Sequence, residues 1–156
     1  EDLTYAGKYL LTDALPGVPV NVGKLVLSPT RTYAPVLLPL LREGLKHIHG
    51  LVHCSGGAQT KVLHFIDQVK VIKDNLFDVP PLFDLIYEQS ATSWQEMYKV
   101  FNMGHRMEVY TTPEFARKVI DTAGFFGIEA RIIGRVESSP IKSVMIRSSK
   151  GEFTYT

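Results

Sequence analysis

The C-terminal part of the chain constrains the fold most, because three successive short segments there are typical of strands. These segments cover residues 129–136, 143–148 and 152–156, and Lys150-Gly151 lies where the last two would be joined by a turn. We therefore expect three strands here, the last two forming a hairpin.

The rest of the chain mixes strand and helix patterns. Strands are expected over residues 50–54, 68–73 and 106–111. Helices are expected over residues 31–48, 60–66, 80–89, 94–101 and from 112 to Gly124 or Gly127. The first of these follows Ser28-Pro29, and its Pro35 and Pro39 require either a late start or a kink. The predicted fold class is α+β (mixed α/β), with one mixed β-sheet packed with helices.

Composition and charge argue against several classes of protein. The 156 residues are 45% hydrophobic and carry a net charge of +1, with scattered Lys and Arg, which argues against binding nucleic acid or a membrane surface. No apolar run approaches the ~20 residues that span a bilayer. With Cys54 as the sole cysteine and no signal-peptide pattern, we expect a cytoplasmic protein.

The N-terminal residues differ from the rest, because they contain Gly and Pro but no sustained period. We interpret residues 1–22 as an extended lead-in from a missing domain, and residues 23–156 as a single domain. The absence of an initiator Met agrees with a piece of a longer protein.

The stretch HGLVHCSGGAQTK, residues 49–61, ends an apolar run in a glycine pair. Ser55, Gly56 and Gly57 between a strand and a helix can present backbone N–H groups to an anion. A glycine turn that merely needs positive φ explains the pattern as well. No Lys-Ser/Thr follows the glycines, so this is not a Walker loop.

A second glycine turn occurs in FNMGHRM, residues 101–107. Asn102 and Gly104 suit a helix C-cap, yet Asn102, His105 and Arg106 could also meet an anionic ligand. Arg31 would complete a phosphate clamp if the chain folds it toward Gly56 and Gly57.

The sequence gives less support to a metal site or a catalytic nucleophile. His47, His49 and His53 share one parity, but Gly50 and a helix end break the register that a zinc site needs. Cys54 and His53 are adjacent in a strand and point to opposite faces, so we expect Cys54 to pack structurally. The carboxylates form no tight cluster, so this chain is not expected to hold Mg-ATP by itself.

Three segments, SPTRTYAPVLLPLL, HGLVHCSGGAQTK and EMYKVFNMGHRMEV, together resemble the phosphoribosylformylglycinamidine cyclo-ligase (aminoimidazole ribonucleotide synthetase) family. The most specific is EMYKVFNMG, which is similar to the family's EMYRTFNMG. Residues 128–136, IEARIIGRV, resemble a late family strand. The resemblance runs from about Val22 to Ile146 and implies the C-terminal domain of a two-domain enzyme.

This resemblance implies an activity and its cofactors. The family closes the imidazole ring in purine synthesis: ATP phosphorylates the amide oxygen of formylglycinamidine ribonucleotide, and a nitrogen then attacks the activated carbon. A missing N-terminal domain would supply the homodimer interface and most contacts to ATP and Mg²⁺. This domain would contact the phosphorylated ribonucleotide substrate, without activity of its own. No catalytic residue can be assigned.

Site residues follow from the matching motif positions. Those expected to bind substrate phosphate are Thr30, Arg31, His53, Ser55, Gly56, Gly57, Asn102, Met103 and Gly104. The chain departs from the family at Ala58, where a third glycine is usual, at Lys61-Val62 for Glu-Asn, and at His105-Arg106 for a small pair. Ala58 would narrow the anion's approach.

Two alternatives remain open from the sequence. One is another ATP-using member of the superfamily, of the selenophosphate synthetase or thiamine-phosphate kinase type, which EMYKVFNMG disfavours. The other is a non-catalytic binding or assembly module.

Overall fold

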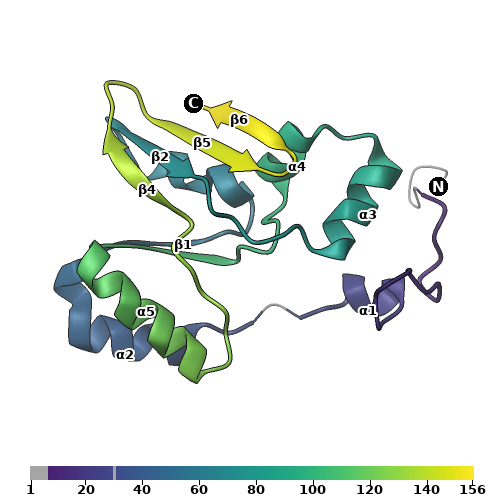
Figure 1. Ribbon diagram of the computed structural model, residues 1–156, viewed down its shortest axis with the longest axis horizontal. Coiled ribbons are helices and arrows are strands. Elements are labelled where there is room, and N and C mark those ends of the chain that lie inside the picture. Colours follow the sequence, from purple (N-terminus) through teal and green to yellow (C-terminus); the bar gives the residue numbers. More distant parts are fainter. Residues whose placement is uncertain (1–6, 30) are drawn as a thin grey trace.

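The largest element is a four-stranded mixed sheet. A computed structural model describes residues 7–29 and 31–156. The sheet contains β2 (Val69–Lys73), β4 (Gly134–Ser138), β5 (Ser143–Ser148) and β6 (Gly151–Tyr155) in the order β4-β2-β5-β6. Strands β2 and β5 are parallel, and the other neighbours are antiparallel (Figure 1). The predicted C-terminal hairpin is confirmed as β5-β6.

The remaining two strands described, β1 (Ile48–His53) and β3 (Met107–Thr111), form a separate antiparallel ribbon. The α+β class is therefore confirmed, but the expectation of one sheet is wrong. Among the described strands, β1 and β3 pair only with each other, whereas η2 (Ala58–His64) contacts both β5 and α4 (Trp94–Val100). A short helical layer thus packs against the four-stranded sheet.

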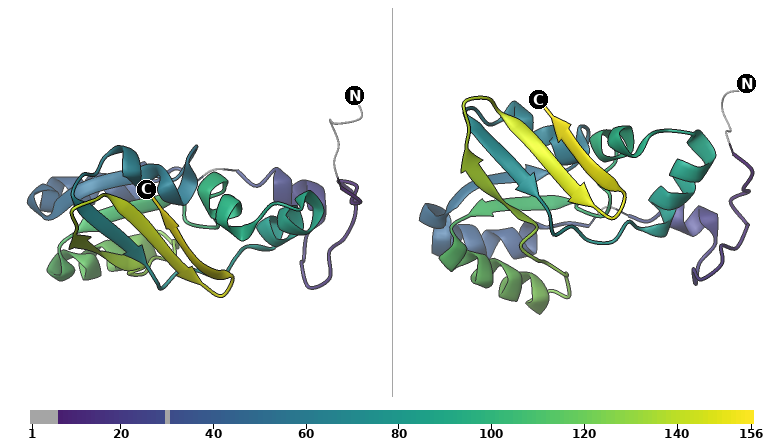
Figure 2. Two further views of the ribbon diagram at one scale, coloured as in Figure 1. Left: turned by 90° about the horizontal axis from the view of Figure 1, so that it is seen from above. Right: turned by 45° about the horizontal axis from the view of Figure 1, so that its top comes forward.

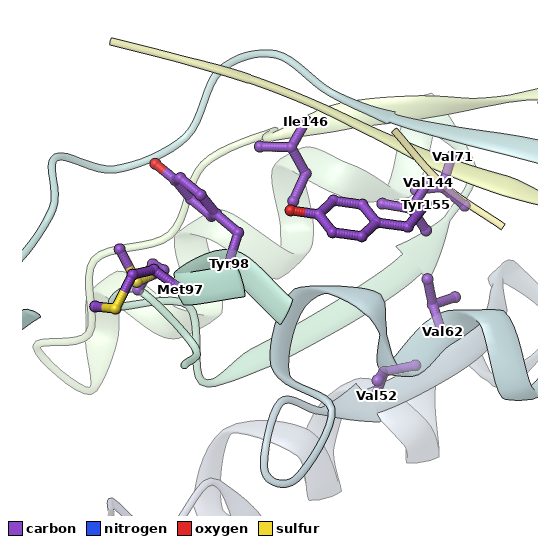
Figure 3. Packing of buried hydrophobic residues seen from close by; sticks show 9 residues of the cluster. Val52, Val62, Val71, Met97, Tyr98, Val144, Ile146 and Tyr155 are labelled. Atoms are coloured by element: carbon purple, nitrogen blue, oxygen red, sulfur yellow. The ribbon is translucent and has the colours of Figure 1, made fainter. Parts of the chain in front are cut away.

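The main hydrophobic core joins the ribbon, this helical layer and the sheet. Val52 comes from β1, Val62 from η2, and Met97 and Tyr98 from α4 (Figure 3). From the sheet, Val71, Val144, Ile146 and Tyr155 complete the labelled set. The Tyr155 hydroxyl donates a hydrogen bond of 2.7 Å to the Gln95 carbonyl, which ties β6 to the start of α4.

A second core lies between α2 (Ala34–Gly44) and α5 (Pro113–Phe125), which pack together below the ribbon in Figure 1. Its buried residues are Val36, Leu40 and Ala123. The helices approach so closely that a Cβ added to Gly44 would lie 2.0 Å from Phe115 Cζ. Gly44 is thus required by packing rather than by a turn.

The first predicted helix is placed wrongly. Ser28-Pro29 does not start a helix; instead α1 (Val22–Val26) precedes it, capped by Asn21 Oδ1, which accepts from the Lys24 N–H at 3.0 Å. Helix α2 begins only at Ala34, so Pro35 lies in its first turn, while Pro39 lies inside the helix. Helix α1 lies beside α3 (Pro81–Ser90), at the end of the molecule away from α2 (Figure 2).

The other boundaries are mostly confirmed. Ser93 Oγ caps α4 by accepting from the Glu96 N–H, and Gly127 has a φ of +65° after α5. The strand predicted over 129–136 begins only at Gly134, where it meets β2: a Cβ on Gly134 would lie 1.8 Å from the Ile72 carbonyl oxygen. No helix within residues 7–29 and 31–156 is long and apolar enough to cross a membrane.

Candidate functional site

The antiparallel ribbon brings two sequence motifs to one end of the fold. His53, at the end of β1, is paired with Met107 at the start of β3, and the Cys54 N–H donates to the Arg106 carbonyl at 2.9 Å. Residues 55–57, here called the first glycine turn, follow β1 directly. Residues 102–104, the second glycine turn, come shortly before β3. The two turns therefore lie beside each other, as an anion-binding wall requires.

The first glycine turn is closed by its own hydrogen bonds and by a lysine. The Ala58 N–H donates to the Ser55 carbonyl at 3.0 Å, and Gly57 has a φ of +83°. Lys61 Nζ donates to Ser55 Oγ at 2.9 Å. Gly56 is exposed, and a Cβ added to it would meet no atom within 4 Å. Its backbone is therefore open to a ligand.

Ala58 does not lie across the open side of this turn. The residue is 1% exposed and packs inside the protein, with a φ of +41°. The expectation that its methyl group narrows the approach of an anion is therefore wrong. Burial also explains why a side chain is tolerated at this φ: the methyl group gains apolar contacts that offset the unfavourable backbone conformation.

The asparagine of the second glycine turn forms a hydrogen bond within the turn. Asn102 Oδ1 accepts from the Gly104 N–H at 2.9 Å, and Gly104 has a φ of +90°. Met103 is 1% exposed and belongs to the main core. Only the backbone of Met103 can therefore contribute to a ligand site, whereas Gly104 lines a cavity.

His105 is a structural residue of this turn. It is 4% exposed; its Nδ1 lies 3.1 Å from the Met103 carbonyl, and its Nε2 accepts from the Phe77 N–H at 3.0 Å. Burial lowers the pKa of His105 from 6.5 to about 4, against a smaller opposing effect of the Met103 hydrogen bond. The ring is neutral at pH 7, so the expectation that His105 meets an anion is not supported.

A cavity of about 340 Å³ lies between Arg31 and the second glycine turn. Arg31, Gly104 and Arg106 all line it, with Tyr33 and Phe77 as aromatic walls. Asp78 and Glu129 also line the cavity, and Glu129 pairs with Arg131 at 2.9 Å. Neither Arg31 nor Arg106 forms a salt bridge with any residue that the structure describes. The two guanidinium groups are thus available for an anionic ligand.

The structure places the remaining predicted site residues as follows. Arg31 reaches the second glycine turn and Arg106, rather than Gly56 and Gly57 as the clamp hypothesis required. Thr30 lies outside the described residues. His53 is exposed at the end of β1. Contact of these residues with a ligand remains a prediction.

A buried polar cluster beside the two turns was missed from the sequence. Lys73 Nζ is fully enclosed and donates to the Gln59 carbonyl at 2.7 Å, to Gln59 Oε1 at 3.0 Å and to Glu108 Oε1 at 2.5 Å. Tyr110 donates from its hydroxyl to Glu108 Oε2 at 2.6 Å. The sequence did contain one signal: Lys73 is two residues after Val71 in a predicted strand, so both side chains lie on the same face of the sheet. A charged residue on a buried face needs a polar partner.

Cys54 and the histidines offer neither a nucleophile nor a metal site. Burial, reinforced by nearby Glu108, raises the pKa of the Cys54 thiol to about 12, so the thiolate is not available. His47 stacks on the Phe115 ring with centroids 5.1 Å apart, whereas His49 and His53 belong to β1. Among the described residues, no three His, Cys, Asp or Glu side chains are placed to hold a metal ion.

The fold and the paired glycine turns define an α+β domain of the AIR synthase-like class. The crystal structure of E. coli HypE, a hydrogenase maturation protein, shares this fold with a TM-score of 0.59 and 16% identity, over 87% of this chain and 45% of that one. The model of the family "AIR synthase related protein, C-terminal domain" matches residues 6–147. The chain belongs to this family.

Three curated relatives share the name phosphoribosylformylglycinamidine cyclo-ligase. The protein of Methanopyrus kandleri is 34% identical over 140 residues, covering 86% of this chain and 39% of that protein. The protein of Enterococcus faecalis is 34% identical over 142 residues, covering 88% and 40%. That of Methanobrevibacter smithii is 31% identical over 148 residues, covering 94% and 42%. The chain thus spans about two fifths of the length of these relatives.

Proposed function

We propose that this chain is the C-terminal part of an ATP-dependent cyclo-ligase that converts formylglycinamidine ribonucleotide to aminoimidazole ribonucleotide in purine biosynthesis. The observation that carries the proposal is the family match over residues 6–147. The shared name of the curated relatives favours this activity over the other superfamily enzymes and over a non-catalytic module.

The part assigned to this chain is binding of the substrate's phosphate. Arg31 and Arg106 can bind phosphate oxygens bidentately from the cavity that they line. The first glycine turn adds the open backbone at Gly56 and the Ser55 hydroxyl, beside the cationic Lys61. We assign the remaining motif residues His53, Asn102, Met103 and Gly104 to the same wall, Met103 through its backbone.

ATP and Mg²⁺ are assigned to the rest of the protein. Mg²⁺ in nucleotide sites is usually held by one or two carboxylates together with the phosphates, and we assign those carboxylates to the part of the protein outside this chain. ATP would supply the phosphoryl group that makes the amide oxygen a leaving group. We further propose a cytoplasmic homodimer, with the dimer contacts outside this chain, and sedimentation of the full-length protein tests that assignment.

The activity is tested on the full-length protein and on this chain. With formylglycinamidine ribonucleotide, ATP and Mg²⁺, the full-length protein should release ADP and aminoimidazole ribonucleotide, whereas residues 1–156 alone should release neither. Turnover by this chain alone would overturn the assignment of the ATP and Mg²⁺ contacts to the rest of the protein. Absence of turnover by the full-length protein would overturn the activity.

The phosphate wall is tested separately by calorimetry with ribose 5-phosphate and the Gly56→Val variant. Because a Cβ at Gly56 meets nothing within 4 Å, the fold should persist while the valine blocks the ligand's approach. We expect at least about a tenfold loss of affinity, equal to ~1.4 kcal/mol. Thr154→Val, at an exposed position of β6, is the control and should bind as the wild type does. Unchanged heats for Gly56→Val would contradict the assignment.

A further inference from the structure

The buried cluster of Lys73, Gln59 and Glu108 joins the two glycine turns. Gln59 lies two residues after the first glycine turn, and its Nε2 donates to the Asn102 carbonyl in the second at 2.7 Å. The same Asn102 carbonyl accepts from the His105 N–H at 2.9 Å. Gln59 is therefore the direct side-chain link between the two turns.

Lys73 fixes the orientation of Gln59. Its ammonium group donates to both the backbone and the side-chain carbonyl of Gln59, so the amide has its oxygen toward Lys73 and its nitrogen toward Asn102. The third N–H of the ammonium group donates a hydrogen bond to Glu108 Oε1. The other carboxylate oxygen of Glu108 accepts from the Tyr110 hydroxyl. All three protons of the ammonium group are used, and the charge is neutralised inside the protein.

The position of the charge excludes direct contact with a ligand. Lys73 is 1% exposed, and it does not line the cavity that holds Arg31 and Arg106. A buried ion pair is also a poor device for stability alone, since apolar residues of similar volume often serve as well. The cluster therefore calls for a reason other than holding the fold together.

We propose that Lys73 is a positioning residue, which holds the two glycine turns in one arrangement through Gln59. The proposal rests on the function proposed above, because that function makes both turns parts of the substrate-phosphate wall. Glu108 supplies the counter-charge that keeps the ammonium group in place. Loss of the cluster should let the turns move apart while the cores that enclose them stay packed.

The test uses the full-length protein and two independent disruptions. Lys73→Met with Glu108→Gln removes both charges but leaves Tyr110 an acceptor. Gln59→Met keeps both charges but removes the link to Asn102, together with the hydrogen bond from Lys73 to Gln59 Oε1. Each should raise KM for formylglycinamidine ribonucleotide at least about tenfold, with little change in kcat or in KM for ATP. Combining them should raise KM no further, because both remove the same link. A loss of kcat from a smaller folded fraction, with KM unchanged, would overturn the proposal.

A matched control is available on the surface. Lys118 and Glu43 form an exposed ion pair at 2.9 Å between α5 and α2, so Lys118→Met with Glu43→Gln makes the same chemical change away from the turns. This control should leave both KM values unchanged. A rise in substrate KM equal to that of the buried variant would also overturn the proposal.

Hydrogen exchange gives a readout that does not depend on activity. In the buried variants, the amides of Ala58 and His105, whose hydrogen bonds close the two turns, should exchange at least about tenfold faster than in the wild type. Amides in the middle of α5 should keep their rates. Faster exchange of both turns supports the positioning role even if the full-length protein lacks cyclo-ligase activity. Unchanged turns, or equally faster exchange throughout the chain, would refute it.

Discussion

Acid should destabilise this fold through the buried His105. In the folded protein, the pKa of His105 falls from 6.5 to about 4 because the ring is buried. Between these values the unfolded chain binds a proton that the folded protein does not, so stability falls as the pH falls from about 6.5 to 4. At ~1.4 kcal/mol for each pKa unit, the loss is about 2 kcal/mol by pH 5 and about 3 kcal/mol by pH 4.

The geometry explains this cost. The Nε2 of His105 accepts from the Phe77 N–H, so a proton added there would place two N–H donors against each other. The assay is urea unfolding, followed by circular dichroism between pH 7.5 and 4, of the wild type and of His105→Asn. The variant has no titratable group at position 105, whereas all carboxylates and all other histidines are the same in both proteins. The wild type should therefore lose about 3 kcal/mol more than the variant. Parallel curves would refute the reasoning.

Two further predictions concern the core between α2 and α5, and the same unfolding measurement checks both. Leu40→Ala should lower the free energy of unfolding by about 2–5 kcal/mol, because Leu40 is completely buried. Leu38→Ala, at a half-exposed position of the same helix, should lower it far less. Equal losses of stability would contradict the packing described. Gly44→Ala should cost about 1–3 kcal/mol by pressing on Phe115, while Gly124→Ala, where a Cβ meets nothing, should be neutral or slightly stabilising. A neutral Gly44→Ala would show that the two helices can separate freely.

The local patterns predicted the element types well and some of their limits poorly. The capping box at Ser93 and the left-handed Gly127 were found because both depend only on residues within one helical turn. The start of the first long helix was misplaced, because Ser28-Pro29 satisfies the local rule for a helix start equally well. Its failure there depends on where α1 and α2 pack, which is not a local property.

The candidate site divides in the same way. The two glycine turns and Arg31 were found as motifs, since glycines and isolated cations are visible in a sequence. That Arg31 shares a cavity with Arg106 rather than with Gly56 depends on how the extended chain before α2 runs past the ribbon. Lys73 and Glu108 lie 35 residues apart, and no local rule pairs them.

The sequence by itself determined the α+β class, the order of most elements, the glycine turns and the family. The class, the order of elements and the turns follow from hydrophobic periodicity and turn chemistry, which neighbouring residues set, whereas the family follows from the resemblance of three motifs. The tertiary structure alone decided that β1 and β3 form their own ribbon, that His105 is buried and neutral, and that Lys73 and Gln59 join the two turns. Each of these depends on which distant segments exclude water from the same space, and burial then sets both the pKa and the hydrogen-bond partners.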